Sequence, residues 1–104
     1  MKFQTSPLKP KKLIKPKNVS GIKLSSVATS IKYRNRDDLM LMSMSPETKV
    51  FGFLTKSSTA SPAVLWCKKV LKNKKARALI VNAGIANVFT GVKGEKSVEK
   101  SIEK

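Results

Sequence analysis

Few residues in this 104-residue sequence are capable of chemistry. It has no His, six Asp or Glu, and one Cys, Cys67. A Cys/His zinc site needs four such ligands and a disulfide needs two Cys, so the composition excludes both. General acid–base chemistry is left to Asp, Glu, Lys, Tyr, Cys or an α-amine. Cys67 lies on an apolar row of a predicted helix with no His to activate it, which favours a small buried side chain over a nucleophile.

An aromatic stretch offers a second kind of chemistry. Residues 49–56 (KVFGFLTK) fit most positions of the aromatic octapeptide of RNA-recognition motifs, in which Phe51 and Phe53 would stack bases. Val50 and Lys56 depart from that pattern, and no aromatic residue lies where the partner strand should be. We therefore interpret Phe51 and Phe53 as core residues. A small basic RNA-binding module is the alternative function.

The stretch from Asn82 to Gly91 (NAGIANVFTG) follows an apolar run and contains several turn-forming residues. The side chains of Asn82 and Asn87 can hydrogen-bond to loop backbone groups, and Asn tolerates left-handed conformations. Thr90 is placed to cap the next turn. Gly91–Gly94 (GVKG) has the form of the nucleotide-gripping loop of K-homology domains. We interpret it as an ordinary glycine turn before a helix.

The net charge of +16 invites a nucleic-acid partner, because Lys and Arg neutralise phosphates. However, the basic residues are 19 Lys and only 3 Arg, and sequence-reading sites favour Arg. We therefore predict a lysine-biased surface and no specific nucleic-acid partner. The longest apolar run is about five residues, far below the ~20 that span a bilayer, and the N-terminus has no apolar signal region. The prediction is a cytoplasmic protein without a membrane partner.

Two regions differ in composition. Residues 1–20 are rich in Lys and Pro, which predicts a basic flexible arm. Residues 21–104 carry strand and helix patterns that predict a single α/β domain, and the unfinished helical pattern of residues 95–104 indicates that this domain is truncated at its C-terminus. Within it, period-2 and helical patterns predict strands over residues 22–33, 38–44, 49–55 and 76–82 and helices over residues 62–72 and 95–104.

Three details of that assignment can be tested by a structure. Ser61 and Pro62 are the N-cap and first residue expected of a helix. Residues 38–44 and 49–55 are predicted to pair as an antiparallel hairpin. Residues 76–81 (ARALIV) are apolar throughout and predict a strand in a sheet interior.

One stretch resembles a known family. Residues 76–91 (ARALIVNAGIANVFTG) closely resemble the RAxVVNSGNANAxTG signature of the bifunctional ornithine acetyltransferase/N-acetylglutamate synthase family, although Ala83 and Ile85 replace polar residues of that signature. Four further segments resemble the family's motifs in the same order: residues 21–32 its G(V/F)xxAAxxAGIK start, 38–41 its DLAL strand, 52–55 its GVFT and 61–67 its SAPVxWC.

The resemblance implies an α/β fold, namely a partial layered sheet-and-helix domain that is the N-terminal part of an ornithine-acetyltransferase-like fold. It also implies a glutamate N-acetyltransferase of arginine biosynthesis, which passes acetyl from N-acetylornithine to glutamate. Bifunctional members also accept acetyl-CoA. Members are much longer precursors that cleave themselves before an internal Thr, which becomes an N-terminal nucleophile.

In that family the nucleophile, the oxyanion hole and the substrate-binding positions lie beyond the part that resembles this chain. The resemblance therefore implies no catalytic, substrate-binding or metal-binding residue here, and no cofactor. The implied partners are the β-chain that carries the Thr, in an α/β heterotetramer, and the substrates N-acetylornithine and glutamate. We expect this chain alone to be inactive and poorly folded, because residues 76–81 need cover on both faces and the sequence supplies one convincing helix.

Overall fold

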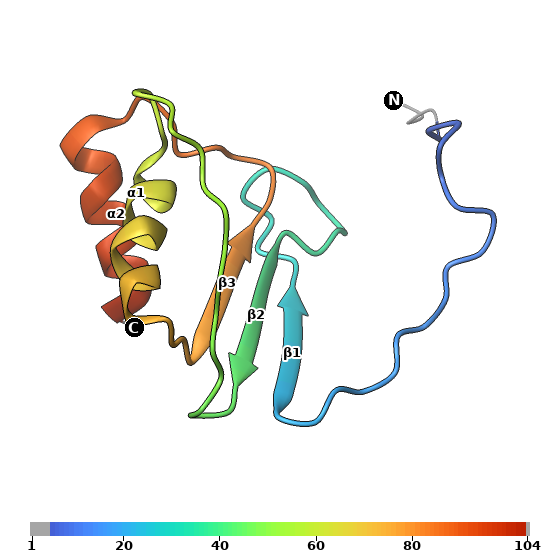
Figure 1. Cartoon of the computed structure of the whole chain (residues 1–104). Coiled ribbons are helices and arrows are strands. Elements are labelled where there is room, and N and C mark those ends of the chain that lie inside the picture. The colour runs from blue at the N-terminus through green and yellow to red at the C-terminus, as the bar shows by residue number, and fades with distance from the viewer. Residues whose placement is uncertain (1–4, 104) are drawn as a thin grey trace.

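The computed structural model describes residues 5–103 and contains a three-stranded sheet and two helices, which confirms the α/β class (Figure 1). The strands are β1 (Ile22–Val27), β2 (Leu39–Met44) and β3 (Ala78–Asn82). The helices are α1 (Pro62–Val70), which continues into the short 3-10 helix η1 (Leu71–Asn73), and α2 (Gly91–Glu103).

The sheet is antiparallel with the order β1-β2-β3, so β2 is the central strand. Met42 lies opposite Leu24 of β1 and Leu79 of β3, which puts these three side chains on one face. Because side chains alternate along a strand, Leu41 lies on the other face, opposite Ile80. Both faces of the sheet are therefore apolar at their centre.

The predicted strand over residues 49–55 is wrong for this structure, and so is the predicted hairpin with residues 38–44. Both edges of β2 are already paired, one with β1 and the other with β3. Neither edge of β2 is therefore available to residues 49–55, which form only an isolated bridge between Lys49 and Lys75.

The sheet interior predicted for residues 76–81 is also wrong. β3 lies at an edge of the sheet, and all five of its residues are exposed. The first strand ends at Val27 rather than at residue 33, and Ser30 soon after has a positive φ of 58° that an extended strand cannot contain.

The helices follow their sequence signals more closely. The predicted start of α1 is confirmed, since the Ser61 Oγ accepts a hydrogen bond from the Val64 N–H (3.4 Å) and Pro62 is the first helical residue. α2 begins at Gly91, four residues earlier than predicted. The two helices contact each other on one side of the sheet (Figure 1).

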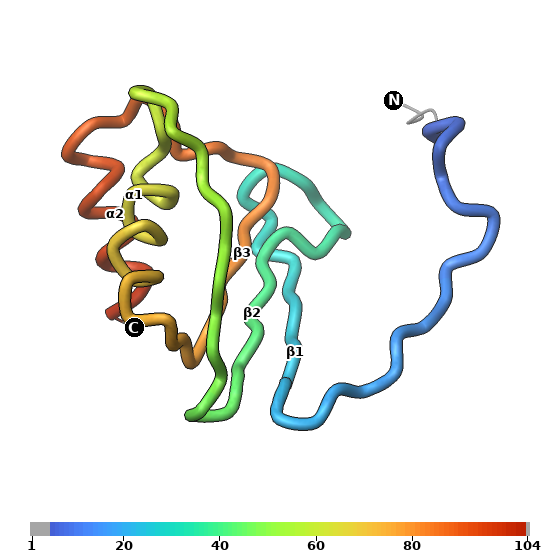
Figure 2. Tube along the Cα trace, viewed as in Figure 1, coloured from blue at the N-terminus to red at the C-terminus, as the bar shows by residue number. Residues whose placement is uncertain are grey.

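Residues 5–20 contain neither helix nor strand, and all of them are exposed. Their trace runs away from the sheet and helices (Figure 2). The flexibility of this arm stays a prediction.

A hydrophobic core is missing from the part of the chain that the structure describes. No hydrophobic side chain is buried there, and the buried residues are Asp38, Pro62 and Gly94. The predicted core positions Phe51 and Phe53 are 74% and 107% exposed, which corrects that interpretation. The radius of gyration is 16.1 Å, against about 13 Å for a compact domain of this length. Within residues 5–103, no helix combines the length and apolarity that crossing a membrane demands.

Candidate functional site

The three strands are tied together at one end by Asp38, the residue just before β2. Its N–H donates to the Val27 carbonyl at the end of β1 (3.1 Å), and its own carbonyl accepts from the Ala83 N–H just after β3 (2.8 Å). Its carboxylate Oδ1 accepts from both the N–H (2.7 Å) and the hydroxyl (2.8 Å) of Thr29. We call Asp38, Thr29 and Ala83 the strand-end hub.

The charge state of the hub follows from these contacts. The backbone hydrogen bond from Thr29, followed by the one from its hydroxyl, holds the pKa of the Asp38 carboxyl below its ordinary value. The carboxylate is therefore ionised near neutral pH. Its second oxygen, Oδ2, is buried and finds no hydrogen-bond partner in the part of the chain that the structure covers.

The loop after β3 rests against the loop before β2. At Gly84, φ is +100°, a conformation that favours glycine, and an added methyl group would lie 3.0 Å from Tyr33 Cε2, so the loop packs closely against this ring. The Arg36 guanidinium lies 5.0 Å from the centre of the same ring. Asn82 Nδ2 donates to the Ile85 carbonyl (3.1 Å), which confirms the predicted bonding of this Asn to the loop backbone.

The other end of the same loop is fixed at the start of α2. Asn87 Nδ2 donates to the Gly94 carbonyl (3.1 Å), again as predicted, and the Thr90 hydroxyl donates to Asn87 Oδ1 (2.5 Å). The Thr90 side chain therefore does not cap α2 itself; it holds the Asn87 side chain, which bonds to the first turn of α2. Gly94 is buried, and a methyl group added there would overlap Thr90 Oγ1 and lie 3.0 Å from Pro62 Cγ of α1. We call Asn87, Thr90, Gly94 and Pro62 the helix-start cluster.

These groups hold a loop in place. Cys67, the only thiol, is half-buried on α1. No group of three or more metal-binding side chains occurs among residues 5–103. That this chain contributes no catalytic, substrate-binding or metal-binding residue stays a prediction.

Sequence reasoning missed the strand-end hub. Thr29 and Asp38 are nine residues apart and separated by a polar turn, so no periodic pattern connects them. The available signal was an acidic residue directly before an apolar strand, a position in which a short polar side chain can bond to loop backbone groups.

Comparison with known proteins places the chain in a family. The model of the ArgJ family matches residues 23–104. The chain is 43% identical over 97 residues to an "Arginine biosynthesis bifunctional protein ArgJ" of Bradyrhizobium diazoefficiens, a match that covers 93% of this chain and 24% of the relative. A protein of the same name from Gluconobacter oxydans is 47% identical over 81 residues, or 78% of this chain and 19% of the relative.

A solved structure agrees with the sequence matches. The ornithine acetyltransferase of Mycobacterium tuberculosis, crystallised with ornithine, has a TM-score of 0.74 and 31% sequence identity to this chain, and the match covers 79% of this chain and 43% of that one. The chain thus spans about a quarter of the length of the curated relatives that it matches. Within that span, the family match and the shared fold establish that the chain belongs to the ArgJ family.

Proposed function

We propose that this chain supplies the N-terminal part of a glutamate N-acetyltransferase in arginine biosynthesis. The observation that carries the proposal is the match to ArgJ proteins over 93% of the chain at 43% identity. The reaction is the transfer of acetyl from N-acetylornithine to glutamate, and acetyl-CoA is a second acetyl donor in a bifunctional enzyme. The ornithine in the crystals of the Mycobacterium tuberculosis protein fits a site for an ornithine-type substrate in the whole enzyme.

The nucleophile of this reaction is supplied by the rest of the polypeptide. We infer a precursor that cleaves itself before an internal Thr, whose α-amine then serves as the base. The solved Mycobacterium chain is about half as long as the curated relative, because 79% of this chain fills 43% of the former, whereas 93% of this chain fills only 24% of the latter. A precursor cut into two chains of similar length would give that ratio. The assembled enzyme is an α/β heterotetramer located in the cytoplasm, without nucleic-acid or membrane partners.

The contribution of this chain is structural. The strand-end hub and the helix-start cluster fix the two ends of the loop between β3 and α2. A loop fixed at both ends is a rigid support on which the rest of the enzyme can be built. In the helix-start cluster, Thr90 donates its hydroxyl proton to an Asn side chain, which cannot act as a base.

A replacement experiment tests the proposal. In the Bradyrhizobium relative, the stretch that matches this chain is replaced by the 104-residue chain, and acetyl transfer from N-acetylornithine to glutamate is measured. We expect the fusion to transfer acetyl, whereas the relative without its matching stretch does not. A fusion that melts cooperatively but transfers no acetyl would contradict the proposed function.

A further inference from the structure

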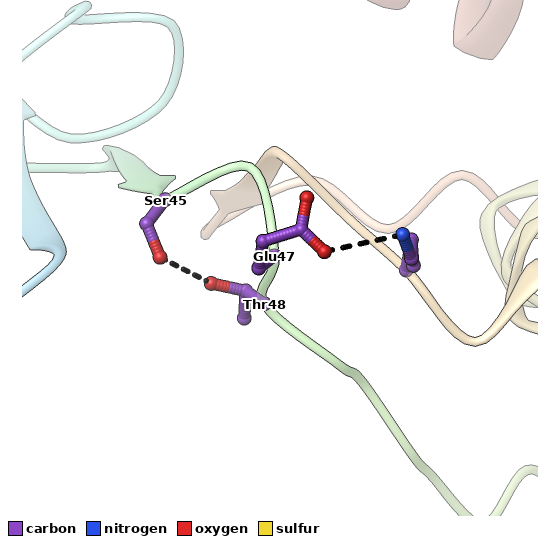
Figure 3. Close-up of polar contacts among 4 residues, drawn as sticks. Ser45, Glu47 and Thr48 are labelled. Atoms are coloured by element: carbon purple, nitrogen blue, oxygen red, sulfur yellow. Dashed lines mark hydrogen bonds and ion pairs between the residues drawn. The ribbon is translucent and has the colours of Figure 1, made fainter.

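After β2 the chain leaves the sheet through a turn and continues as the extended segment 49–56 (Figure 1). The hydroxyls of Ser45 and Thr48 lie 3.1 Å apart across this turn, and Lys75 donates to Glu47 Oε2 (3.3 Å), as Figure 3 shows. The first contact lies within the turn, and the Glu47–Lys75 pair joins the turn to the residues that precede β3.

Beyond its first residues, the segment has no backbone partners. The Val50 N–H donates to the Lys74 carbonyl (3.0 Å). For residues 51–56, neither N–H nor C=O groups form a hydrogen bond to any residue between 5 and 103. Extended backbone with free N–H and C=O groups is a template for pairing with another strand.

The two faces of the segment differ. A methyl group added at Gly52 would lie 3.5 Å from Leu71 Cδ1, so this position faces η1, and Leu54 on the same side is half-buried. Phe51 and Phe53 alternate with these positions and point away, with exposed fractions of 74% and 107%. One face of the segment thus packs against η1, and the other face is aromatic and exposed. Apolar residues on both faces are typical of a strand that is buried on both sides.

The amount of exposed surface calls for a partner larger than a peptide. The accessible area is 9873 Å². A folded body of residues 21–104 with an unfolded 20-residue arm would expose about 8,100 Å². The excess of about 1,700 Å² is roughly twice what one partner buries in an interface of standard size. Three quarters of the curated relative's length lies outside the match, which is enough polypeptide to cover it.

We propose that segment 49–56 is a latent strand that pairs with a strand from the part of the ArgJ polypeptide that this chain does not contain, burying Phe51 and Phe53. The inference rests on the proposed function, because that function supplies the partner. The flanking Lys49 and Lys56 keep their charges at the ends of the paired region. RNA is the weaker partner, since RNA-recognition motifs stack bases on a four-stranded sheet and this segment lies outside the sheet.

Hydrogen exchange on the fusion described above tests the pairing. We expect at least every second amide from residue 51 to residue 55 to exchange at least tenfold more slowly than the amides of residues 11–15, which lie in the exposed arm of the same molecule. Hydroxyl-radical labelling of Phe51 and Phe53 should also fall at least fivefold from its level in the 104-residue chain alone. An active fusion in which residues 51–55 exchange as fast as residues 11–15 would overturn the inference and leave the proposed function standing.

Variants of the fusion separate the pairing from general hydrophobicity. F51S/F53S should lose the slow exchange of residues 51–55, whereas F51L/F53L should retain it. The matched control is L8S/I14S, which removes two side chains of the arm that are 91% and 85% exposed, and which should leave exchange and acetyl transfer unchanged. A different partner would be shown if the 104-residue chain alone dimerises or binds single-stranded RNA and F51S/F53S abolishes this association. If residues 51–55 of the fusion also exchange without protection, the aromatic face belongs to that other partner and the proposal is wrong.

Discussion

The isolated chain should not fold into a stable monomer. The perturbation is the absence of the rest of the proposed enzyme, and the structure gives the area of surface that is left uncovered. About 1,700 Å² of surface is exposed beyond the expectation for a folded body with an arm. If about 55–60% of that surface is apolar, as on ordinary protein surfaces, roughly 1,000 Å² of apolar area is uncovered.

The free energy of burying that apolar area can be compared with the stability of a whole domain. At about 25 cal/mol per Å², 1,000 Å² of apolar surface corresponds to roughly 25 kcal/mol, which is an upper value because unfolded chains already bury part of it. Whole domains have a net stability of only about 5–15 kcal/mol. Even half of the upper value is comparable to that whole margin, so the loss of this burial should leave the chain without a stable folded state.

The assay is a thermal melt followed by circular dichroism and by calorimetry, with sedimentation to establish the oligomeric state. We expect a gradual change of signal with no heat-absorption peak, and aggregation as the concentration rises. The fusion should melt cooperatively under the same conditions. A cooperative melt of monomeric 104-residue chain would refute the reasoning, because it would show that the exposed surface does not need a cover.

Three further predictions concern the fusion. The stability that Asp38 contributes should be fully present above the ordinary pKa of an Asp and be lost as the pH falls through its lowered folded pKa. D38N should therefore flatten the acid limb of the stability curve, and an acid limb as steep as that of the unchanged fusion would contradict this role. G94A should lower the free energy of unfolding by about 1–3 kcal/mol in denaturant titrations, because its methyl group overlaps Thr90 Oγ1, and a stabilising effect would contradict the packing described here. S61A should cost about 1 kcal/mol in the same titrations through loss of the α1 cap, and an unchanged midpoint would show that this hydrogen bond contributes nothing.

Sequence signals that depend on neighbours along the chain predict this structure well. The cap of α1 needs only Ser61 and Pro62, and it forms as expected. The two Asn side chains of the loop bond to backbone groups within a few residues of themselves, at Ile85 and Gly94. In each case the partner is close in sequence, so the residue type and its position specify the contact.

Signals that depend on distant partners predict less. An apolar run predicts that a strand will be buried, but it does not predict which segment of the protein will bury it. Residues 78–82 therefore form a strand as predicted, yet lie at an edge of the sheet instead of in its interior. The strand-end hub was missed for the same reason, since nothing in the sequence links Asp38 to residues nine positions before it and forty-five positions after it.

The disagreement at residues 49–55 carries information about the missing partner. Their alternation is that of a strand, yet both edges of β2 are occupied, and residues 51–56 do not pair with the outer edge of β1 or of β3. Selection for a period-2 pattern acts on the assembled protein, in which both faces and the backbone must be satisfied. A segment that has the pattern of a strand but lacks its pairing therefore marks where the rest of the ArgJ polypeptide should join. β3 makes the same point independently, because its apolar residues are exposed along an edge whose outer side is free. If β3 and segment 49–56 each pair with a strand from the remaining polypeptide, the three-stranded sheet becomes part of a larger one. Amides along the outer edge of β3 should then become protected in the fusion, together with those of segment 49–56.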